Sequence, residues 1–316
     1  MVTKHRRIAV MRAISQNTFG GPDVLETVEI PRPQPGPGEV LVRVAATSVN
    51  PADWKIRAGY LRDRLGEPPL TLGLDVAGTV IERGEEVTGL ERGDEVFGVF
   101  MSRFGAYAEY AVVPANTLAI RPAGLDAVQA AALPTAALTA WQALANLRAG
   151  QRILIHAAAG GVGHVAVQIA KARGASVIGT ARAVNHDFLR SLGADELIDY
   201  TTVDFAEVVR EVDVVLDLIG GDYGQRSLRT LRADGVYFDT QGSDAEGDPR
   251  YVRVYMDPNS SDAREVGTLA AQGKLRIEIE RVMSLADVAE AHKLSESGRV
   301  RGKIVLVPWE DGGASA

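Results

Sequence analysis

The pattern of apolar and polar residues changes character near Leu125. Before this point, short segments in which apolar and polar residues alternate are separated by turn residues, and this pattern predicts β-strands. We expect the fold to begin near Arg12 and to include strands over residues 40–49, 75–81, 94–100 and 106–113. The first part of the chain is therefore predicted to form an all-β, partly open barrel.

After Leu125, short apolar segments alternate with helical patterns. Strands are predicted over residues 152–155, 176–181, 196–199, 212–219, 235–240 and 252–256, with a last helix over 263–272. This alternation is typical of right-handed βαβ units in a doubly wound parallel sheet. The segments 275–282, 284–296 and 304–307 do not follow this alternation of strands and helices. They predict that the chain returns to complete the first domain. We therefore predict an α/β protein with one domain formed by residues 11–124 and 274–316, and a second over 125–273.

A glycine-rich turn follows the apolar strand Ile153–Ile155. Ala158, Gly160, Gly161 and Gly163 precede a helix predicted over residues 165–173. Free backbone N–H groups and the positive end of the helix dipole bind a pyrophosphate at such a turn. The fingerprint is G-x-G-x-x-G, here with Ala158 in the first place. An ordinary strand-to-helix turn is the alternative, but the strand before and the helix after favour dinucleotide binding.

The end of the second parallel strand distinguishes NAD from NADP in this fold. The strand over residues 176–181 ends without a carboxylate, which would hold the ribose 2′-hydroxyl and repel a 2′-phosphate. Arg182 follows instead, with Asn185 and His186 nearby. Because a guanidinium binds phosphate oxygens in a bidentate way, the sequence predicts NADPH. The alternative is an arginine that faces solvent in a loop.

Three further segments lie where parallel strands end. Tyr200 is expected either beside the adenosine or as a half-buried tyrosine at a strand edge. The turn containing Ile219 and Gly220, and the segment Gln241–Gly242, are expected at the carboxyl edge of the sheet. Their backbone amides can meet the nicotinamide half of a dinucleotide. Helix-capping glycines are the alternative interpretation.

Composition excludes several classes of function. The net charge of −7 argues against general nucleic-acid binding, and the basic residues 4–7 are expected to be a solvated tail, like residues 310–316. Because no apolar run is long enough for a membrane span or a secretion signal, we expect a cytoplasmic protein. The chain has no cysteine, which excludes disulfides, a thiolate nucleophile and cysteine-bound zinc. Its five histidines lack metal-binding spacing, so we expect no metal.

Four motifs together resemble the medium-chain dehydrogenase/reductase family. They are the segments 156–163 (HAAAGGVG), 50–55 (NPADWK), 133–141 (LPTAALTAW) and 302–306 (GKIVL). Within that family the chain is similar to the zinc-independent quinone oxidoreductases, which include the zeta-crystallins, over residues 11–307. The resemblance implies a GroES-like β domain interrupted by a Rossmann domain, NADPH as hydride donor, a homodimer, and reduction of quinones or α,β-unsaturated carbonyls.

The resemblance also implies residue roles. Thr135 is expected to contact the nicotinamide, and Gly160, Gly161 and Val162 the pyrophosphate. Thr180, Arg182 and Tyr200 are expected around the adenosine phosphate, and Lys303 of the GKIVL motif among the cofactor contacts. Quinone oxidoreductases often carry lysine at the position of Asn185, a departure for which Arg182 compensates. Zinc-dependent relatives place a cysteine near Asn50 and a His-Glu pair near Leu74–Asp75, and this chain has neither.

The candidates for the acceptor side are Asn50, Asp53, Tyr60 and Thr135. Asn50 is the first candidate to donate a hydrogen bond to the acceptor carbonyl, with an Asx-type turn before Pro51 as the alternative. Asp53 and Lys55 are expected to form an ion pair that shapes the cleft, unless Lys55 is a plain surface residue. Tyr60 is expected to donate a proton or to lie over a quinone ring, and water is an alternative proton source.

The predicted function is NADPH-dependent hydride transfer to a small-molecule quinone or enone, without nucleic-acid or membrane partners. Good orientation of the two reactants supplies most of the rate enhancement in such a reaction, up to about 7–11 kcal/mol. Two alternatives remain open at this point. One is an enoyl-thioester reductase, which would need a basic rim for its substrate. The other is a non-catalytic NADPH-binding protein.

Overall fold

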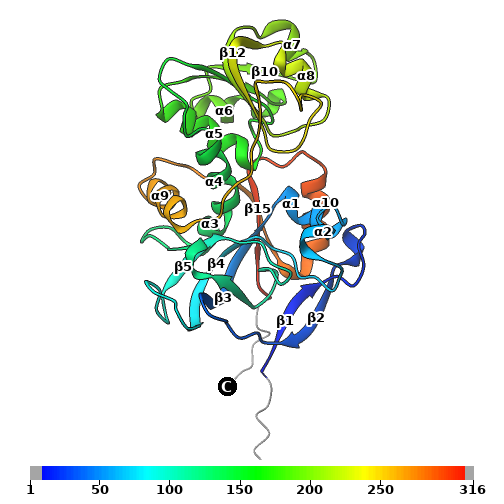
Figure 1. Cartoon of the computed structure of the whole chain (residues 1–316), viewed down its shortest axis with the longest axis vertical. Helices are drawn as coiled ribbons and strands as arrows, with labels where there is room; N and C mark the ends of the chain where they lie inside the picture. The colour runs from blue at the N-terminus through cyan, green and yellow to red at the C-terminus, as the bar shows by residue number, and fades with distance from the viewer. Residues whose placement is uncertain (1–8, 310–316) are drawn as a thin grey trace, which may run out of the picture.

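The computed structural model describes residues 9–309. Figure 1 shows two regions stacked along the long axis of the molecule, each built on one large sheet. The lower region contains both ends of the described chain, and the middle of the chain forms the upper region. This arrangement confirms the predicted α/β class with an interrupted first domain. The basic residues 4–7 and the tail 310–316 lie outside the described residues.

The lower region, here called the β domain, is built on a seven-stranded sheet. Its strand order is β14-β15-β3-β4-β5-β7, with β6 paired to β3. These strands are β3 (Glu39–Val49), β4 (Asp75–Arg83), β5 (Glu95–Val99), β6 (Tyr110–Pro114), β7 (Leu118–Ile120), β14 (Ile279–Ser284) and β15 (Lys303–Val307). Strand β15 runs antiparallel to β3, with Ile304 opposite Val49. The chain therefore returns to complete its first domain, as predicted.

Two features of the β domain differ from expectation. The fold begins at Val10 rather than Arg12, because β1 (Val10–Ser15) pairs with β2 (Glu26–Pro31) in a separate two-stranded sheet. We did not predict β2, whose side chains are largely exposed and partly charged. We also did not predict the helix α1 (Pro51–Arg57), which begins directly after Asn50. The other helices here are α2 (Arg62–Leu65) and α10 (Val288–Glu296).

The upper region, here called the parallel-sheet domain, has the strand order β10-β9-β8-β11-β12-β13. All five pairings are parallel. The strands are β8 (Arg152–Ile155), β9 (Ser176–Thr180), β10 (Glu196–Ile198), β11 (Val212–Asp217), β12 (Leu231–Asp239) and β13 (Tyr251–Arg253). The strand order reverses between β8 and β11. In an open parallel sheet, ligands bind at this point, outside the carboxyl ends of the strands.

Helices connect and flank these strands. They are α3 (Ala127–Ala132), α4 (Pro134–Ala143), α5 (Gly161–Ala172), α6 (His186–Ser191), α7 (Phe205–Val208), α8 (Tyr223–Leu228) and α9 (Ser260–Ala271). Helices α3 and α9 contact strands of the β domain, although the predicted boundaries assign both to residues 125–273. Those boundaries stay a prediction. None of the helices within residues 9–309 is long and apolar enough to cross a bilayer.

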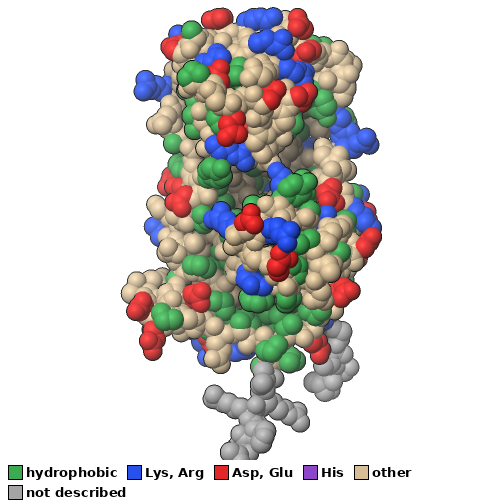
Figure 2. Space-filling model, turned by 45° about the vertical axis from the view of Figure 1, so that its right-hand side comes forward, with side chains coloured by type: hydrophobic (Ala, Val, Ile, Leu, Met, Phe, Trp, Pro, Cys, Tyr) green, Lys and Arg blue, Asp and Glu red, His purple; other side chains and the backbone are tan. Residues whose placement is uncertain are grey.

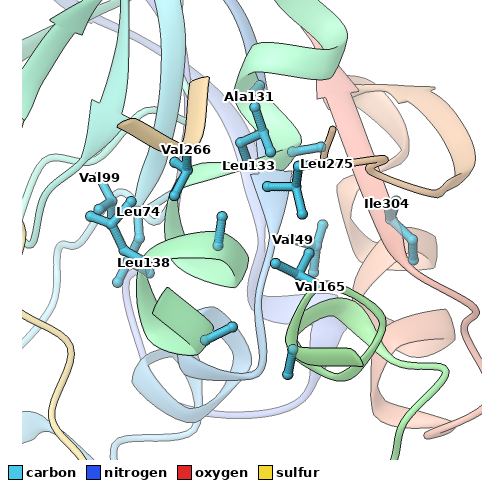
Figure 3. Close-up of a cluster of buried hydrophobic side chains, with 14 of the residues drawn as sticks. Val49, Leu74, Val99, Ala131, Leu133, Leu138, Val165, Val266, Leu275 and Ile304 are labelled. Atoms are coloured by element: carbon cyan, nitrogen blue, oxygen red, sulfur yellow. The ribbon is translucent and has the colours of Figure 1, made fainter. Parts of the chain in front are cut away.

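A single hydrophobic cluster extends through both regions. Figure 3 shows Val49 and Ile304 of the β domain close to Val165 of α5, with Leu133 and Leu275 nearby. All five side chains are buried. Because packed interiors deform little, this cluster holds the glycine turn of one domain at a fixed place against the other.

Candidate active site

The glycine turn leads directly from β8 into α5. The helix begins at Gly161 with Gly160 as N-cap, four residues before the predicted start at Val165. Gly161, Val162 and Gly163 therefore form its first turn, where backbone N–H groups have no partner within the helix. A Cβ atom at Gly163 would lie 2.3 Å from the carbonyl oxygen of Ala157, so only glycine allows this close approach. Backbone amides in this arrangement can bind an anion.

The C-terminal segment of the chain packs on this turn. The Gly302 N–H donates to the Ala159 carbonyl at 2.9 Å. A Cβ atom at Gly161 would lie 3.0 Å from Cδ of Lys303. His164 donates from Nδ1 to the Gly160 carbonyl at 2.8 Å and accepts from the Glu278 N–H at 3.0 Å through Nε2. Burial lowers the pKa of His164 to about 4, so a neutral imidazole joins the turn to the β domain.

The residues predicted around the adenosine end lie at or after the ends of two neighbouring strands, β9 and β10. Thr180 is fully buried and its hydroxyl contacts His156 Nδ1 at 3.2 Å, so its side chain does not lie at the open edge as expected. Arg182 is half-buried and its Nη2 lies 3.4 Å from the Arg299 carbonyl oxygen. Asn185 precedes α6 and is half-buried, whereas Tyr200 is 42% exposed.

A carboxylate that we did not predict lies beside this segment. Asp199 follows β10 and accepts hydrogen bonds from the Thr201 hydroxyl at 2.7 Å and from the Ala183 N–H at 3.3 Å. The Thr201 bonds lower the pKa of Asp199 and keep it ionised. Arg182 is therefore accompanied by one negative charge from the neighbouring strand.

The turns expected to offer amides to a nicotinamide are internally bonded. Asp217 accepts from the Ile219 and Gly220 N–H groups at 2.8 and 3.1 Å. The Gln241 and Gly242 N–H groups both donate to Asp239, at 2.7 and 2.8 Å. These four amides are thus committed within the protein, which corrects the expectation that they are free donors. The turns still line the carboxyl edge of the sheet, where Gly221 donates to the Gly242 carbonyl at 2.8 Å.

A cluster of buried polar side chains lies where β3, β4, α4 and β15 meet. The Thr135 hydroxyl donates to Asp75 Oδ1 at 2.7 Å, and the Thr135 N–H to the same oxygen at 2.8 Å. Asn50 Nδ2 donates to Asp75 Oδ2 at 2.8 Å. Lys303 Nζ donates to Asn50 Oδ1 and lies 3.5 Å from Asp75 Oδ2. The structure therefore brings together three residues predicted separately, Asn50, Thr135 and Lys303, around Asp75.

Lys303 is the only basic side chain of this cluster, and it is 4% exposed. Burial lowers the pKa of Lys303, while the negative charges of Asp75 and Asp53 oppose that shift. Asn50 is 2% exposed, and both ends of its amide are engaged. The structure thus places Asn50 as a bridge between Lys303 and Asp75 rather than as the free donor that we expected.

The hydrogen-bond partners of Asp53 differ from the predicted partner, Lys55. Asp53 accepts from the Asn50 N–H at 2.8 Å and from the Gly73 N–H at 3.0 Å. Burial raises the pKa of Asp53 to about 7, the Asn50 N–H opposes the shift, and repulsion by Asp75 adds to it. Lys55 contacts Gln241 instead, so the expected ion pair between Asp53 and Lys55 is not formed. Tyr60, after α1, is 77% exposed.

A second buried chain of polar groups was not predicted from the sequence. Arg57 Nη1 donates to His292 Nδ1 at 2.9 Å, and His292 Nε2 lies 3.2 Å from the Tyr107 hydroxyl. Burial lowers the pKa of His292 to about 3, so it stays neutral between these partners. No local pattern signals this contact, because Arg57 and His292 are 235 residues apart. Asp75 had a signal, a lone carboxylate at the start of an apolar strand.

We next considered whether the side chains of this site could bind a metal ion. Within residues 9–309, no group of three or more histidine, cysteine, aspartate or glutamate side chains is placed to hold a metal ion. At the positions where zinc-dependent relatives carry ligands, Asn50 and Asp75 bond to each other and to Lys303. This donor set, with an ammonium among it, does not suit a cation.

Comparisons with known proteins agree with this architecture. Residues 36–123 match the family model described as alcohol dehydrogenase GroES-like domain, and residues 192–306 match the one described as zinc-binding dehydrogenase. A quinone-oxidoreductase homolog from the chloroplast of Spinacia oleracea is 36% identical, covering 95% of this chain and 99% of that protein. An NADPH-dependent alkenal/one oxidoreductase from Arabidopsis thaliana chloroplasts is 32% identical, covering 94% and 80%.

A solved structure shows the same fold. The quinone oxidoreductase from Coxiella burnetii has 38% sequence identity and a TM-score of 0.89, covering 95% of this chain and 99% of that one. The GroES-like domain and the parallel-sheet domain expected from the sequence motifs are thereby confirmed.

Proposed function

The chain belongs to the quinone oxidoreductase branch of the medium-chain dehydrogenase/reductase family, and we propose that it is an NADPH-dependent, zinc-independent reductase of quinones or α,β-unsaturated carbonyls. One observation carries the proposal. The free amides of the first turn of α5 lie against Lys303, whose ammonium is part of the buried cluster with Asn50, Asp75 and Thr135. The contact between Gly161 and Lys303 thus joins the proposed nucleotide site to the buried polar cluster.

The residues present fit a nicotinamide dinucleotide phosphate. The amides of Gly161, Val162 and Gly163, with Gly160 as N-cap, would hold the pyrophosphate. Arg182, with Asn185 and Tyr200 nearby, would hold the 2′-phosphate, since no carboxylate ends β9. Asp199 lowers the positive potential there but is itself bonded to Ala183 and Thr201. Ile219, Gly220 and Gln241 would line the nicotinamide end. When bound, the reduced nicotinamide supplies the hydride.

The buried cluster orients the reacting groups. Asp75 fixes the Thr135 side chain through two hydrogen bonds, which sets the wall against which the nicotinamide would lie. Lys303 offsets the negative charge of Asp75 in a water-poor place, where charge interactions are strong. The negative charge that develops on a carbonyl oxygen as it accepts hydride therefore does not face an unpaired carboxylate. Asp53 caps α1 and holds Asn50 in place, and Tyr60 at the rim contributes apolar surface.

Two further properties stay predictions. The homodimer is expected from the family, and the exposed edge of β13 offers unpaired backbone groups at which sheets can join. A cytoplasmic location is expected from the sequence alone. Neither property is needed for the hydride transfer proposed above.

Calorimetry and an acceptor panel test the proposal. We expect NADPH to bind more tightly than NADH, and NADPH to be consumed with 1,4-benzoquinone, phenanthrenequinone or a simple enone, but not with a crotonyl thioester. Turnover of the thioester alone would favour an enoyl-thioester reductase. Tight NADPH binding without turnover of any acceptor would show a binding protein instead, and absence of NADPH binding would overturn the proposal.

A further inference from the structure

Lys55 is a half-buried cation without an anionic partner. It lies on α1 of the β domain, and its Nζ donates to Gln241 Oε1 of the parallel-sheet domain at 2.5 Å. In the part of the chain that the structure describes, residues 9–309, no carboxylate lies within ion-pair distance of Lys55. A neutral amide oxygen satisfies one of its three N–H donors and none of its charge. Such a position favours an external anion.

A second cation faces Lys55 from the opposite domain. Arg253 ends β13, and its Nη1 lies within 3.6 Å of where a Cβ atom on Gly242 would be, next to Gln241. Its repulsion, after burial, lowers the pKa of Lys55, and the charge of Asp239 opposes that shift. Arg253 contacts Asp239 only through Nη1, at 3.2 Å, and lies over the ring of Tyr255, which is 78% exposed.

One buried carboxylate partly offsets these charges: Asp239 Oδ1 forms an ion pair with Arg253 at 3.2 Å, and Asp239 Oδ2 is buried without a hydrogen-bond partner among the described residues. Asp239 is fully buried, and its Oδ1 already accepts from the Gln241 and Gly242 N–H groups. Lys55 and Arg253 thus contribute two positive charges against one buried carboxylate. The guanidinium keeps N–H groups that do not contact Asp239, and the ammonium keeps two. The pair can therefore bind both oxygens of a carboxylate.

The position of this pair matches the acceptor end of the site. Asn50, the N-cap of α1, belongs to the buried cluster with Lys303, and Lys55 is five residues further along. At a rise of 1.5 Å and about 100° per residue, Lys55 lies about 7.5 Å further along the helix axis and leaves the helix on a different side from Asn50. Gln241 follows β12 at the carboxyl edge of the parallel sheet. The contact with Gln241 therefore places the Lys55 ammonium at this edge.

We propose that Lys55 and Arg253 form a subsite for a carboxylate carried by the acceptor. The preferred acceptors are then α,β-unsaturated ketones that also bear a carboxylate. The inference rests on the proposed function and specifies its substrate class. In the reaction the alkene gains the hydride of the reduced nicotinamide at one carbon and a proton from water at the other, and the carboxylate is unchanged.

A binding measurement tests the subsite without turnover. Calorimetry compares 4-oxopentanoate, a saturated product of this class, with its uncharged methyl ester. We expect the acid to bind about tenfold more tightly, which corresponds to about 1.4 kcal/mol. Lys55→Met and Arg253→Met should each abolish that preference. Lys293→Met, which removes an equal charge from an exposed pair with Asp23, should keep it.

Steady-state kinetics with a matched pair of acceptors give the second readout. The probes are trans-4-oxo-2-pentenoate and its methyl ester, which share one enone. We expect the ratio of their kcat/KM values, acid over ester, to fall about tenfold in Lys55→Met and to recover in Lys55→Arg. Equal values for acid and ester in the wild type, or an unchanged ratio in Lys55→Met, overturn the subsite. Failure of the ester and of 1,4-benzoquinone as well would instead overturn the proposed function.

Discussion

The Lys303 ammonium donates a hydrogen bond to the Asn50 amide oxygen, joining strand β15 to the N-cap of α1. Asn50 in turn donates to Asp75, and Lys303 lies 3.5 Å from the same carboxylate. All three side chains are buried. The charges of Lys303 and Asp75 therefore depend on each other, and on the neutral Asn50 amide between them, in a medium that solvates ions poorly.

Removing Lys303 tests this dependence. We expect Lys303→Met to lower the free energy of unfolding by about 3–5 kcal/mol, because it leaves the Asp75 charge buried without its cation. The double variant Lys303→Met/Asp75→Asn should lose clearly less than the sum of the two single changes. Urea unfolding of the four proteins measures this coupling. Strict additivity would contradict a buried charge pair.

Arg182 is predicted to hold the 2′-phosphate. We expect Arg182→Glu to weaken NADPH binding about 10- to 150-fold, since a charge-assisted hydrogen bond contributes about 1.5–3 kcal/mol. NADH binding should change little. Arg190→Glu is the matched control, because Arg190 lies on α6 and pairs with Asp187 on the exposed surface. Calorimetry with both nucleotides decides the matter, and unchanged NADPH affinity in Arg182→Glu would exclude this residue as the phosphate ligand.

Two glycines of the glycine turn between β8 and α5 differ in what surrounds them. A Cβ atom at Gly163 would lie 2.3 Å from the Ala157 oxygen, whereas at Gly160 the nearest atom would be 3.3 Å away. We expect Gly163→Ala to destabilise the fold by about 1–3 kcal/mol through overpacking. Gly160→Ala should unfold at nearly the wild-type temperature, since Gly160 has a φ of −76°. Thermal unfolding of both variants distinguishes the two glycines, and equal midpoints would refute the assignment.

Buried titratable groups predict how stability depends on pH. Burial lowers the pKa of His156 and His292 to about 3 and that of His164 to about 4, so all three stay neutral in the folded state and gain protons on unfolding below pH 6.5. Asp53 acts in the opposite sense: its folded pKa of about 7 lies above the unfolded value, so its contribution is full at low pH and is lost as the pH rises to 7.

The three histidines and Asp53 together take up about two protons on unfolding between pH 6 and 5. Burial also raises the pKa of Asp217, which acts in the same sense as Asp53, so stability should fall by at most about 2.7 kcal/mol over that unit of pH. Urea unfolding at the two pH values measures the change. His164→Gln should reduce the slope by about one proton, while replacement of the exposed residue Lys293 by methionine should leave it unaltered. A slope that is the same in His164→Gln would show that His164 is not neutral in the fold.

Local sequence patterns were sufficient to predict the fold class and the glycine turn. The strand at Ile153–Ile155 and the glycines after it are adjacent in sequence, so their pattern predicts their structure directly. The start of α5 was placed late because Gly160 offers no capping side chain and glycine disfavours helices. For α1 a signal did exist: Asn50, Pro51 and Asp53 match the N-cap, N1 and N3 preferences of a helix start.

The polar contacts of the site were harder to predict. Thr180 lies at the expected strand end, but its burial against His156 depends on packing between β8 and β9. The committed amides of Gln241 and Gly242 depend on Asp239, whose side-chain direction no periodicity specifies. Arg57 and His292 meet only because α10 returns to the β domain near the end of the chain. Such contacts follow from tertiary structure and have no local signature.

Strand β15 pairs with β3, with Ile304 opposite Val49, and the Lys303 ammonium donates to the Val49 carbonyl across 254 residues. During synthesis the whole parallel-sheet domain must leave the ribosome before the last partner of β3 exists. Until then Asp75 and Asn50 lack their cation, and the apolar face around Val49 lacks Ile304. A nascent chain is thus able to fold its parallel-sheet domain first, while the β domain stays incomplete until the final strand is made.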